Sequence, residues 1–554
     1  MHKLAIFCFL VLQCISAIAG EPLVTVEQGS LRGKEIVLEN GKVYHKYSGI
    51  PYAKPPLGNL RFKPTQKADP WTGTYDAFKE GSTCITSNGQ GNEDCLFLNV
   101  YVPQTSAKKS LPVKVYIHGG GFVNGDGNTY KLGPEYLMNY DVILVTLNYR
   151  LGALGFLNLE IEDAPGNMGL MDQVEALRWV NKNIAAFGGD PTNITISGGS
   201  AGSASAHYLI LSDSAKGLFQ RAILESGSAL NPWAFQRNHL KRASDLCKAL
   251  KIPTSDPEAA LSALRNVSAK TIILTKVPPE VAGQLLTDFG FVPSLEKKFS
   301  THTPFLTELP ITKMLSGNFT KVPIIAGINS AEGLLFMPSV KNNPNFMQGF
   351  ENSIEKLIPN DLELTPGSNE SIELAKQIKA FYFQNKPIPE NIPALIDEFS
   401  DNWFIRGLDR LVKITAKSQT EPVYYYEYFF DENPLNKILN GPHNVKGASH
   451  GDEMINIFKM ELYVTKVNET ETMLLTRTRM LEMWTNFIKF GNPTPEVTSV
   501  LPVKWLPVTE TEVNFLSINY NLTTGINPED IRMQFWNNVT ASIADNKYNK
   551  HYLY

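Results

Sequence analysis

The chain has 554 residues, with 51 lysines and arginines against 55 aspartates and glutamates and a hydrophobic fraction of 43%. A formal charge of −4 without long single-sign runs offers no basic surface for a nucleic-acid backbone, which excludes nucleic-acid binding as a function class. The composition is that of a soluble globular chain, and its length is sufficient to bury a large core.

The first 19 residues have the pattern of a signal peptide. Lys3 provides a positive start, residues 4–15 form an apolar run, and Ala17-Ile18-Ala19 is a small-x-small cleavage pattern. This run is too short to favour a membrane span, and no later run approaches 18 apolar residues. We therefore expect residues 1–19 to be removed and residues 20–554 to form a secreted, extracellular protein without a membrane span.

Three cysteines remain after the predicted signal peptide. Cys84 and Cys95 bracket a Gly/Asn/Ser-rich segment that can curl back and let the two sulfurs meet. A disulfide there would stabilise the fold by about 3 kcal/mol. Cys247 lies in a helical pattern, which favours a buried inert thiol over a functional one.

Seven Asn-X-Ser/Thr sequons occur in the chain. One of them, Asn193, begins a predicted core strand and is expected to stay unmodified. The six expected glycosylation sites are Asn266, Asn318, Asn369, Asn468, Asn521 and Asn538.

Short β-branched or apolar runs alternate with helical patterns or long loops. The predicted strands are 113–117, 142–147, 193–198, 221–224, 322–328 and 423–430, and a clear helical period covers 172–187. Strands that read as nearly continuous apolar runs are typical of a sheet covered on both faces. We expect one α/β domain, with a large, mostly parallel central sheet between helices.

The strongest chemical signal is Gly198-Gly199-Ser200-Ala201-Gly202. It follows a predicted strand and precedes a plausible helix at 203–211, so Ser200 lies on a strand-to-helix turn. Such a turn exposes the hydroxyl above the sheet, and the glycines two residues to either side let strand and helix approach closely. An ordinary glycine-rich turn is the competing interpretation.

A glycine-rich turn can stabilise the oxyanion that a serine nucleophile creates. His118-Gly119-Gly120-Gly121-Phe122 follows the predicted strand 113–117 and leaves its amides uncovered. We assign the amides of Gly120, Gly121 and Ala201 as the oxyanion hole. A phosphate cradle is disfavoured because no Gly-Lys-Ser/Thr follows.

The base is found by elimination among nine histidines. Where a serine nucleophile lies on a strand-to-helix turn of an α/β sheet, the acid and then the histidine follow the serine along the chain. His2, His45 and His118 precede Ser200, His207 lies on the same predicted helix, His239 and His302 precede the best acid, and His551 is in the C-terminal tail. His443 and His450 remain, and His450 lies in a small-residue loop that can carry an imidazole into a cleft.

The acid should follow a strand so that it can orient the imidazole. Glu332 comes shortly after the predicted strand 322–328 and is the candidate. Asp452 and Glu453 are rivals, but they adjoin His450 too closely in sequence and are expected to cap a helix that starts there.

These motifs identify a resemblance to the type-B carboxylesterase and cholinesterase family of α/β-hydrolases, above all to the secreted insect carboxylesterases. Further matching blocks are GIPYAKPP at 49–56, EDCLFLN at 93–99, NYRLG at 148–152 and FGGDP at 187–191. The resemblance runs from about Pro22 to about Trp536. It implies a Ser200, Glu332 and His450 triad, the oxyanion hole assigned above, and a Cys84–Cys95 disulfide.

Two departures from the family pattern bear on the substrate. Most relatives have Glu where Gly199 stands, and juvenile hormone esterases typically have Gln, so substrate preference at this position is open. The segment 85–94 lacks the tryptophan that stacks on a quaternary ammonium in cholinesterases, so cholinesterase activity is not expected.

The expected function is hydrolysis of carboxylic esters through an acyl-enzyme, on small to medium hydrophobic esters including xenobiotics, with organophosphates able to modify Ser200. Phe122, Gly199 and Trp233 are expected at the substrate pocket, with core packing as an equal alternative for Phe122 and Trp233.

No cofactor, metal or obligatory protein partner is expected. The alternatives are an esterase for juvenile hormone or another signal ester, an ester-sequestering protein with little turnover, and an adhesion or scaffold protein.

Overall fold

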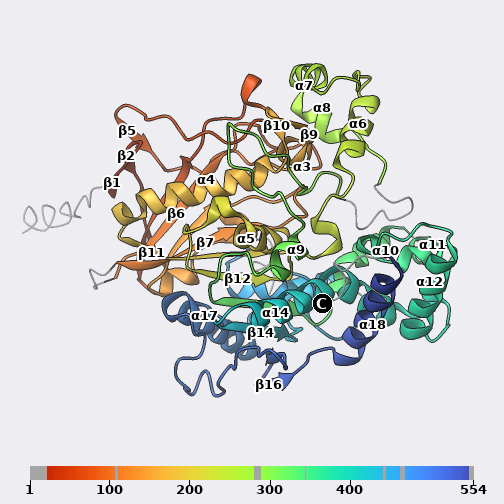
Figure 1. The fold of residues 1–554 in the computed structure, drawn as a ribbon. Coiled ribbons are helices and arrows are strands. Elements are labelled where there is room, and N and C mark those ends of the chain that lie inside the picture. The colour runs from red at the N-terminus through yellow and green to blue at the C-terminus, as the bar shows by residue number, and fades with distance from the viewer. Residues whose placement is uncertain are drawn as a thin grey trace, which may run out of the picture.

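A mixed eleven-stranded sheet runs through the molecule (Figure 1). The computed structural model describes residues 21–105, 110–279, 289–343, 345–440, 445–461 and 468–547. The predicted signal peptide, His443 and His551 lie outside these ranges. In sheet order the strands are β16 (Leu522–Ile526), β15 (Asn514–Ile518), β14 (Val423–Tyr428), β13 (Ile324–Asn329), β12 (Arg221–Glu225), β11 (Gly189–Gly199), β7 (Leu111–Ile117), β8 (Ile143–Leu147), β6 (Phe97–Pro103), β4 (Val43–Pro51) and β3 (Lys34–Val37).

The centre of the sheet is parallel and its edges are antiparallel. Neighbouring strands are parallel from β8 to β15, whereas β16 and the three strands beyond β8 pair antiparallel. The six predicted strands correspond to β7, β8 and β11 to β14, which all belong to the parallel centre. These strands read as apolar runs because helices cover them on both sides.

Two hydrophobic clusters fill the two faces of the sheet. On β7, Val115 and Ile117 belong to one cluster and Tyr116 to the other, as expected from the alternation of side chains along a strand. The first cluster includes side chains of α4 (Met168–Asn183), α5 (Ala201–Leu211) and α14 (Arg406–Ser418); the second includes side chains of α17 (Glu471–Phe490). The two-sided cover predicted from the sequence is confirmed.

The remaining helices lie beside this core. In Figure 1, α6 (His239–Ala249), α7 (Pro257–Asn266) and α8 (Ala269–Leu274) form one group, and α10 (Met337–Asn342), α11 (Phe346–Glu351) and α12 (Asn369–Phe383) form another near α18 (Asp530–Lys547). Shorter elements are β1 (Leu23–Val26), β2 (Gly29–Arg32), β5 (Thr74–Asp76), α2 (Thr129–Leu132), α3 (Gly152–Phe156), β9 (Asn158–Ile161), β10 (Ala164–Pro165), α9 (Pro310–Leu315), α13 (Ile392–Ser400) and α15 (Pro434–Asn440). Of the helices in the described ranges, none has the length and hydrophobicity needed to cross a bilayer.

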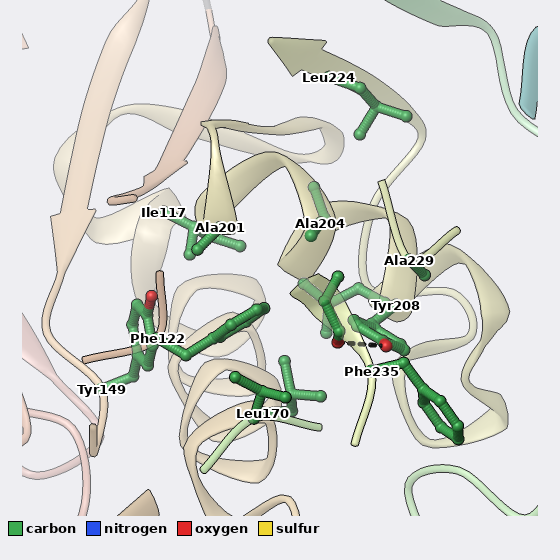
Figure 2. Packing of buried hydrophobic residues seen from close by; sticks show 14 of the residues in the cluster. Ile117, Phe122, Tyr149, Leu170, Ala201, Ala204, Tyr208, Leu224, Ala229 and Phe235 are labelled. Atoms are coloured by element: carbon green, nitrogen blue, oxygen red, sulfur yellow. Dashed lines mark hydrogen bonds between the residues drawn. The ribbon is translucent and has the colours of Figure 1, made fainter. Parts of the chain in front are cut away.

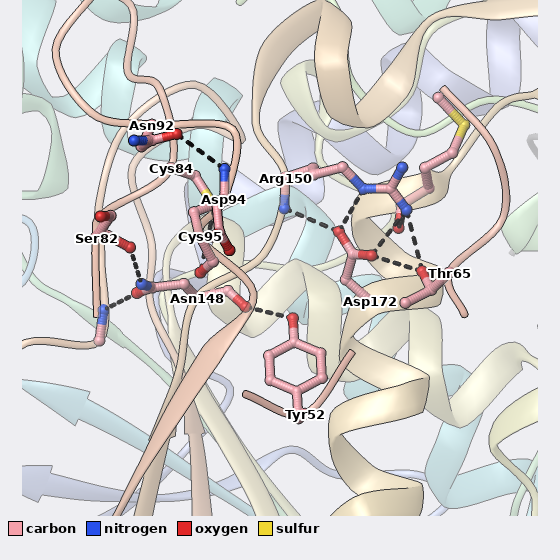
Figure 3. The surroundings of a disulfide bond; sticks show 12 residues. Tyr52, Thr65, Ser82, Cys84, Asn92, Asp94, Cys95, Asn148, Arg150 and Asp172 are labelled. Carbon is pink, nitrogen blue, oxygen red and sulfur yellow. Dashed lines mark hydrogen bonds and ion pairs between the residues drawn. A yellow bond between two sulfur atoms is a disulfide. The ribbon is translucent and has the colours of Figure 1, made fainter. Parts of the chain in front are cut away.

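A disulfide joins Cys84 and Cys95, as predicted (Figure 3). Close to it, Arg150 forms two side-chain hydrogen bonds of 2.8 Å to Asp172, which is buried on α4. This pair ties the segment after β8 to the helix that covers the sheet. Cys247 is a buried free thiol on α6, and burial raises its pKa, which agrees with the inert role expected.

Candidate active site

Ser200 occupies a strained turn between β11 and α5. Its φ of 58° and ψ of −124° lie outside the regions that side-chain-bearing residues prefer, which costs about 1–3 kcal/mol. Its amide donates a 2.8 Å hydrogen bond to the carbonyl of Glu225 at the end of β12. The neighbouring strand therefore holds the backbone of the turn in this conformation.

The glycines around Ser200 are required by close backbone contacts. A Cβ on Gly198 would lie 2.4 Å from the carbonyl carbon of Gly202, and a Cβ on Gly202 would lie 2.0 Å from the carbonyl oxygen of Ile117. Neither site has room for a side chain. The predicted close approach of strand and helix at this turn is confirmed.

The glycine loop after β7 lies directly against Ser200. A Cβ on Gly119 would be 3.0 Å from the Cβ of Ser200. Gly120 and Gly121 have φ of 111° and 62°, and the carbonyl of Gly120 accepts hydrogen bonds from the amides of Val123 and Asn124. Consecutive positive φ values of this kind can direct amides to one side, as in backbone anion sites.

Glu332 and His450, which are 118 residues apart in sequence, are in contact. The Nδ1 atom of His450 lies 2.5 Å from Oε2 of Glu332, and the other carboxylate oxygen accepts a 2.8 Å bond from the amide of Asn329. The Glu332 side chain is fully buried, whereas 9% of the His450 side chain is exposed. Because Nδ1 is engaged, Nε2 is the ring nitrogen left to exchange a proton with a substrate or a nucleophile.

Three hydrogen bonds join the loops that carry this pair. The amide of Ala331 donates to the carbonyl of Ala448 at 2.9 Å, and the amide of Ala448 donates to Oγ of Ser330 at 3.1 Å. The side chain of Asn329 donates to the carbonyl of Ser449 at 2.8 Å. The loop after β13 and the loop before His450 therefore form one unit.

The histidines and acids that were rejected as catalytic candidates, such as His118, His207, Asp452 and Glu453, lie in other surroundings than the Glu332–His450 pair. Burial lowers the pKa of His118 to about 4 and that of His207 to about 3, which favours neutral rings. Asp452 accepts a 3.1 Å hydrogen bond from the amide of Asn436, and Glu453 accepts one from Asn329. The expectation that the two acids cap a helix was wrong in detail, since both lie inside a 3₁₀ turn, Asp452–Asn456, that begins after Gly451.

A π-helix, Asp401–Ile405, brings aromatic rings to the histidine. The ring of Phe404 lies 4.4 Å from the ring of His450, centroid to centroid. The carbonyl of Trp403 accepts hydrogen bonds of 2.7 Å from both Asn231 and Trp233. A π-helix displaces carbonyls from the regular hydrogen-bond ladder, and here side chains of the segment after β12 donate to two of them, those of Trp403 and Phe404. The sequence showed the aromatic pair but no pattern that predicts a π-helix.

The predicted pocket residues Phe122 and Trp233 are both buried. Figure 2 shows Phe122 among Ile117, Leu170 and Ala201 in the core. Trp233 contacts Phe122 and also Phe404 and Phe289, with ring centroids 6.1–6.3 Å apart. Trp233 thus connects the glycine loop to the aromatic ring on His450. Phe289, Trp403 and Phe404 were not predicted from the sequence.

Gly199, the third predicted pocket residue, is buried between Met454 and Tyr116. A Cβ at this position would lie 2.8 Å from Sδ of Met454 and 3.1 Å from Oη of Tyr116.

In the described residues no group of three or more His, Cys, Asp or Glu side chains has the arrangement of a metal site.

A mixed sheet with a parallel centre, together with a strained serine between a strand and a helix, defines this chain as an α/β-hydrolase. The carboxylesterase family matches residues 20–536, and the chain belongs to that family. It is 34% identical to a juvenile hormone esterase of Tribolium castaneum, covering 94% of this chain and 90% of that protein. It is likewise 34% identical to a carboxylic ester hydrolase of Bombus ignitus, covering 95% of each.

Among solved structures, the chain resembles juvenile hormone esterase from Manduca sexta with OTFP covalently attached. The TM-score is 0.83 at 28% identity, covering 94% of this chain and 100% of the other. The resemblance predicted from the sequence motifs is confirmed, and membership of the family supports ester hydrolysis as the chemistry of this chain.

Proposed function

We infer that this protein is a serine carboxylesterase in which Ser200 is the nucleophile, His450 the general base and Glu332 the group that orients and stabilises the imidazole. The observation that carries this proposal is the 2.5 Å contact between Nδ1 of His450 and the buried carboxylate of Glu332. A buried carboxylate on one ring nitrogen fixes the tautomer and favours the cation that forms at the other nitrogen.

The proposed reaction has two steps. His450 takes the proton of Ser200 as its oxygen attacks the ester carbonyl, and the amides of Gly120, Gly121 and Ala201 stabilise the oxyanion. His450 then protonates the leaving alcohol, which departs and leaves an acyl-enzyme. Water attacks the acyl-enzyme in the same way, releases the acid and restores the Ser200 hydroxyl.

The proposed substrates are small to medium hydrophobic esters, including xenobiotics. The aromatic rings of Phe404, Trp233 and Phe289 support this choice because Phe404 lies against His450 and the other two rings extend its apolar surface. A signal ester is the second candidate, favoured by the similarity to juvenile hormone esterases of two insects. Comparing kcat/KM for a juvenile hormone methyl ester and for a naphthyl ester separates the two.

We propose further that the protein is secreted and glycosylated. The signal-peptide pattern at residues 1–19 supports export. All six expected glycosylation sites, Asn266, Asn318, Asn369, Asn468, Asn521 and Asn538, are exposed. Asn193 is only partly exposed, and its side chain accepts a hydrogen bond from Arg221, which agrees with an unmodified residue.

The proposed function is tested by hydrolysis of a short-chain aryl ester with purified protein. The wild type should release the alcohol with repeated turnover, and Ser200→Ala should lower kcat by about 10⁶-fold. A wild-type protein that binds the ester without releasing the alcohol would instead support the sequestering protein.

A further inference from the structure

The space beside Gly199, the residue before the proposed nucleophile, is occupied by Met454. Real Cβ atoms essentially never approach a heavy atom within 3.0 Å, yet a Cβ on Gly199 would lie 2.8 Å from Sδ and 3.7 Å from Cε of Met454. The end of the Met454 side chain therefore packs on the bare backbone of Gly199. A side chain at position 199 and the thioether compete for one place.

The surroundings fix Met454 in this position. It belongs to the 3₁₀ turn Asp452–Asn456, which begins directly after His450 and Gly451. The hydroxyl of Tyr116 donates a 3.3 Å hydrogen bond to Sδ of Met454. The neighbours Glu453 and Ile455 are buried, which anchors the backbone on both sides.

Met454 is partly exposed although both of its neighbours are buried, and Ser200 and His450 are partly exposed as well. Met454 is four residues from His450 along the chain and in contact with the residue before Ser200. A Cβ on Gly451, the residue after His450, would lie 4.0 Å from the same Sδ, so the thioether lies between the backbone next to Ser200 and the backbone next to His450. A leaving alcohol must lie on the histidine side of Ser200, because His450 has to protonate its oxygen.

We propose that Met454 is a specificity-determining residue that lines the site of the leaving alcohol, limits the size of the alcohol and offers no charge to bind a cationic one. The inference rests on the proposed function. A thioether is apolar and polarisable and adapts to irregular shapes, but it offers no charge to a cationic alcohol. The nearby acids Glu225 and Glu453 are buried, and burial raises the pKa of each, which favours their uncharged forms.

Met454→Ala tests this assignment with two substrate series. The first keeps the acyl group as butyrate and varies the alcohol from p-nitrophenol to 1-naphthol; the second keeps p-nitrophenol and varies the acyl chain. The variant should raise kcat/KM for the naphthyl ester relative to the nitrophenyl ester by about 10-fold, since a few removed heavy atoms change discrimination by 10–200-fold. The acyl-chain profile should stay as in the wild type.

Met171→Ala is the matched control, because Met171 is a partly buried methionine of α4 that packs against the first hydrophobic cluster, whereas Met454 packs against the second, on the other face of the sheet. It should leave both profiles unchanged. An alcohol profile of Met454→Ala that equals the wild type, or a change confined to the acyl series, would overturn the inference. Wild-type protein without turnover would instead overturn the proposed function, so the two failures are distinguishable.

A second pair of variants tests the competition for space. Gly199→Ala alone should lower kcat/KM for p-nitrophenyl butyrate by about 10-fold or more, because the new Cβ collides with Sδ. Adding Met454→Ala should recover most of that loss. A double variant no more active than Gly199→Ala would show that the two residues do not share one place.

Discussion

The buried carboxylate of Glu332 contacts His450, the candidate base. A glutamine at position 332 separates the effect of the carboxylate's charge from that of its shape. Glu332→Gln keeps an oxygen that can accept a hydrogen bond from Nδ1 of His450 but removes the charge that favours the imidazolium. We expect kcat to fall by about 10³–10⁴-fold with little change in KM, measured with an aryl ester. Glu373→Gln, at an exposed residue of α12, is the control. A less than 10-fold loss for Glu332→Gln would contradict the role assigned to Glu332.

Gly202 shows how a single residue positions the nucleophile. Gly202→Ala would place a Cβ 2.0 Å from the carbonyl oxygen of Ile117. The backbone must shift, so we expect the free energy of unfolding to fall by about 1–3 kcal/mol or more and esterase activity to be lost. Gly349→Ala is the control, because the nearest heavy atom to its Cβ would be 3.7 Å away. Urea unfolding and a hydrolysis assay check both variants, and a fully active, stable Gly202→Ala would refute the tight packing of this turn.

At the level of elements, α13 and the π-helix that follows it contain a buried acid. Glu398 is completely buried, accepts a hydrogen bond from Asn402 and lies near Arg406 and near Asp401, a second acid whose pKa burial raises to about 7. Burial raises the pKa of Glu398 from its ordinary value of 4.5 to about 8. This acid is therefore mostly protonated in the folded protein at neutral pH.

The sign of the pH dependence follows from that shift. Between pH 4.5 and about 8, the unfolded chain has lost the Glu398 proton while the folded protein retains it, so stability falls as the pH rises. Relative to Glu398→Gln, the free energy of unfolding of the wild type should decrease by up to about 1.4 kcal/mol per pH unit in this window. Denaturant titrations at pH 5.5, 7 and 8.5 measure the difference. Equal slopes in the two proteins would show that Glu398 is ionised when folded.

The disulfide loop is the second element whose contribution can be isolated. Replacing Cys84 and Cys95 by serine frees a short loop in the unfolded chain, and we expect the free energy of unfolding to fall by about 3 kcal/mol. Cys247→Ser, which removes a buried free thiol, separates the effect of the cross-link from that of the substitution itself. Denaturation curves that coincide for the double variant and the wild type would contradict this account.

At the scale of the whole molecule, the sequence predicted six of the seven strands in the parallel run from β8 to β15, missing β15, and none of the antiparallel strands at either side. Strands β7, β8 and β11 to β14 are buried on both faces and read as apolar runs. Strands β15 and β16 are partly exposed, so their sequences carry mixed polar and apolar residues and no clear signal. Strand β6 is almost wholly buried but was not predicted either, so local composition located most, and not all, of the buried strands.

The candidate site, like the sheet, could be predicted from the sequence only in part. The turn at Ser200 was predictable because its glycines are required by local backbone contacts. The contact of Glu332 with His450 was predictable from chain order and loop composition, whereas Phe404 and Met454 were not. Their positions depend on a π-helix and on a 3₁₀ turn packed against distant strands. The spacing of residues along the sequence does not predict such contacts.

The role of Ser200 as the nucleophile can be measured by mass spectrometry of the intact protein and its peptides after reaction with an organophosphate. We expect one phosphoryl adduct, located on Ser200, with loss of esterase activity in proportion to labelling, because the Ser200 oxygen displaces the leaving group as His450 takes its proton. An adduct on another residue that abolishes activity while Ser200 stays unmodified would contradict this role.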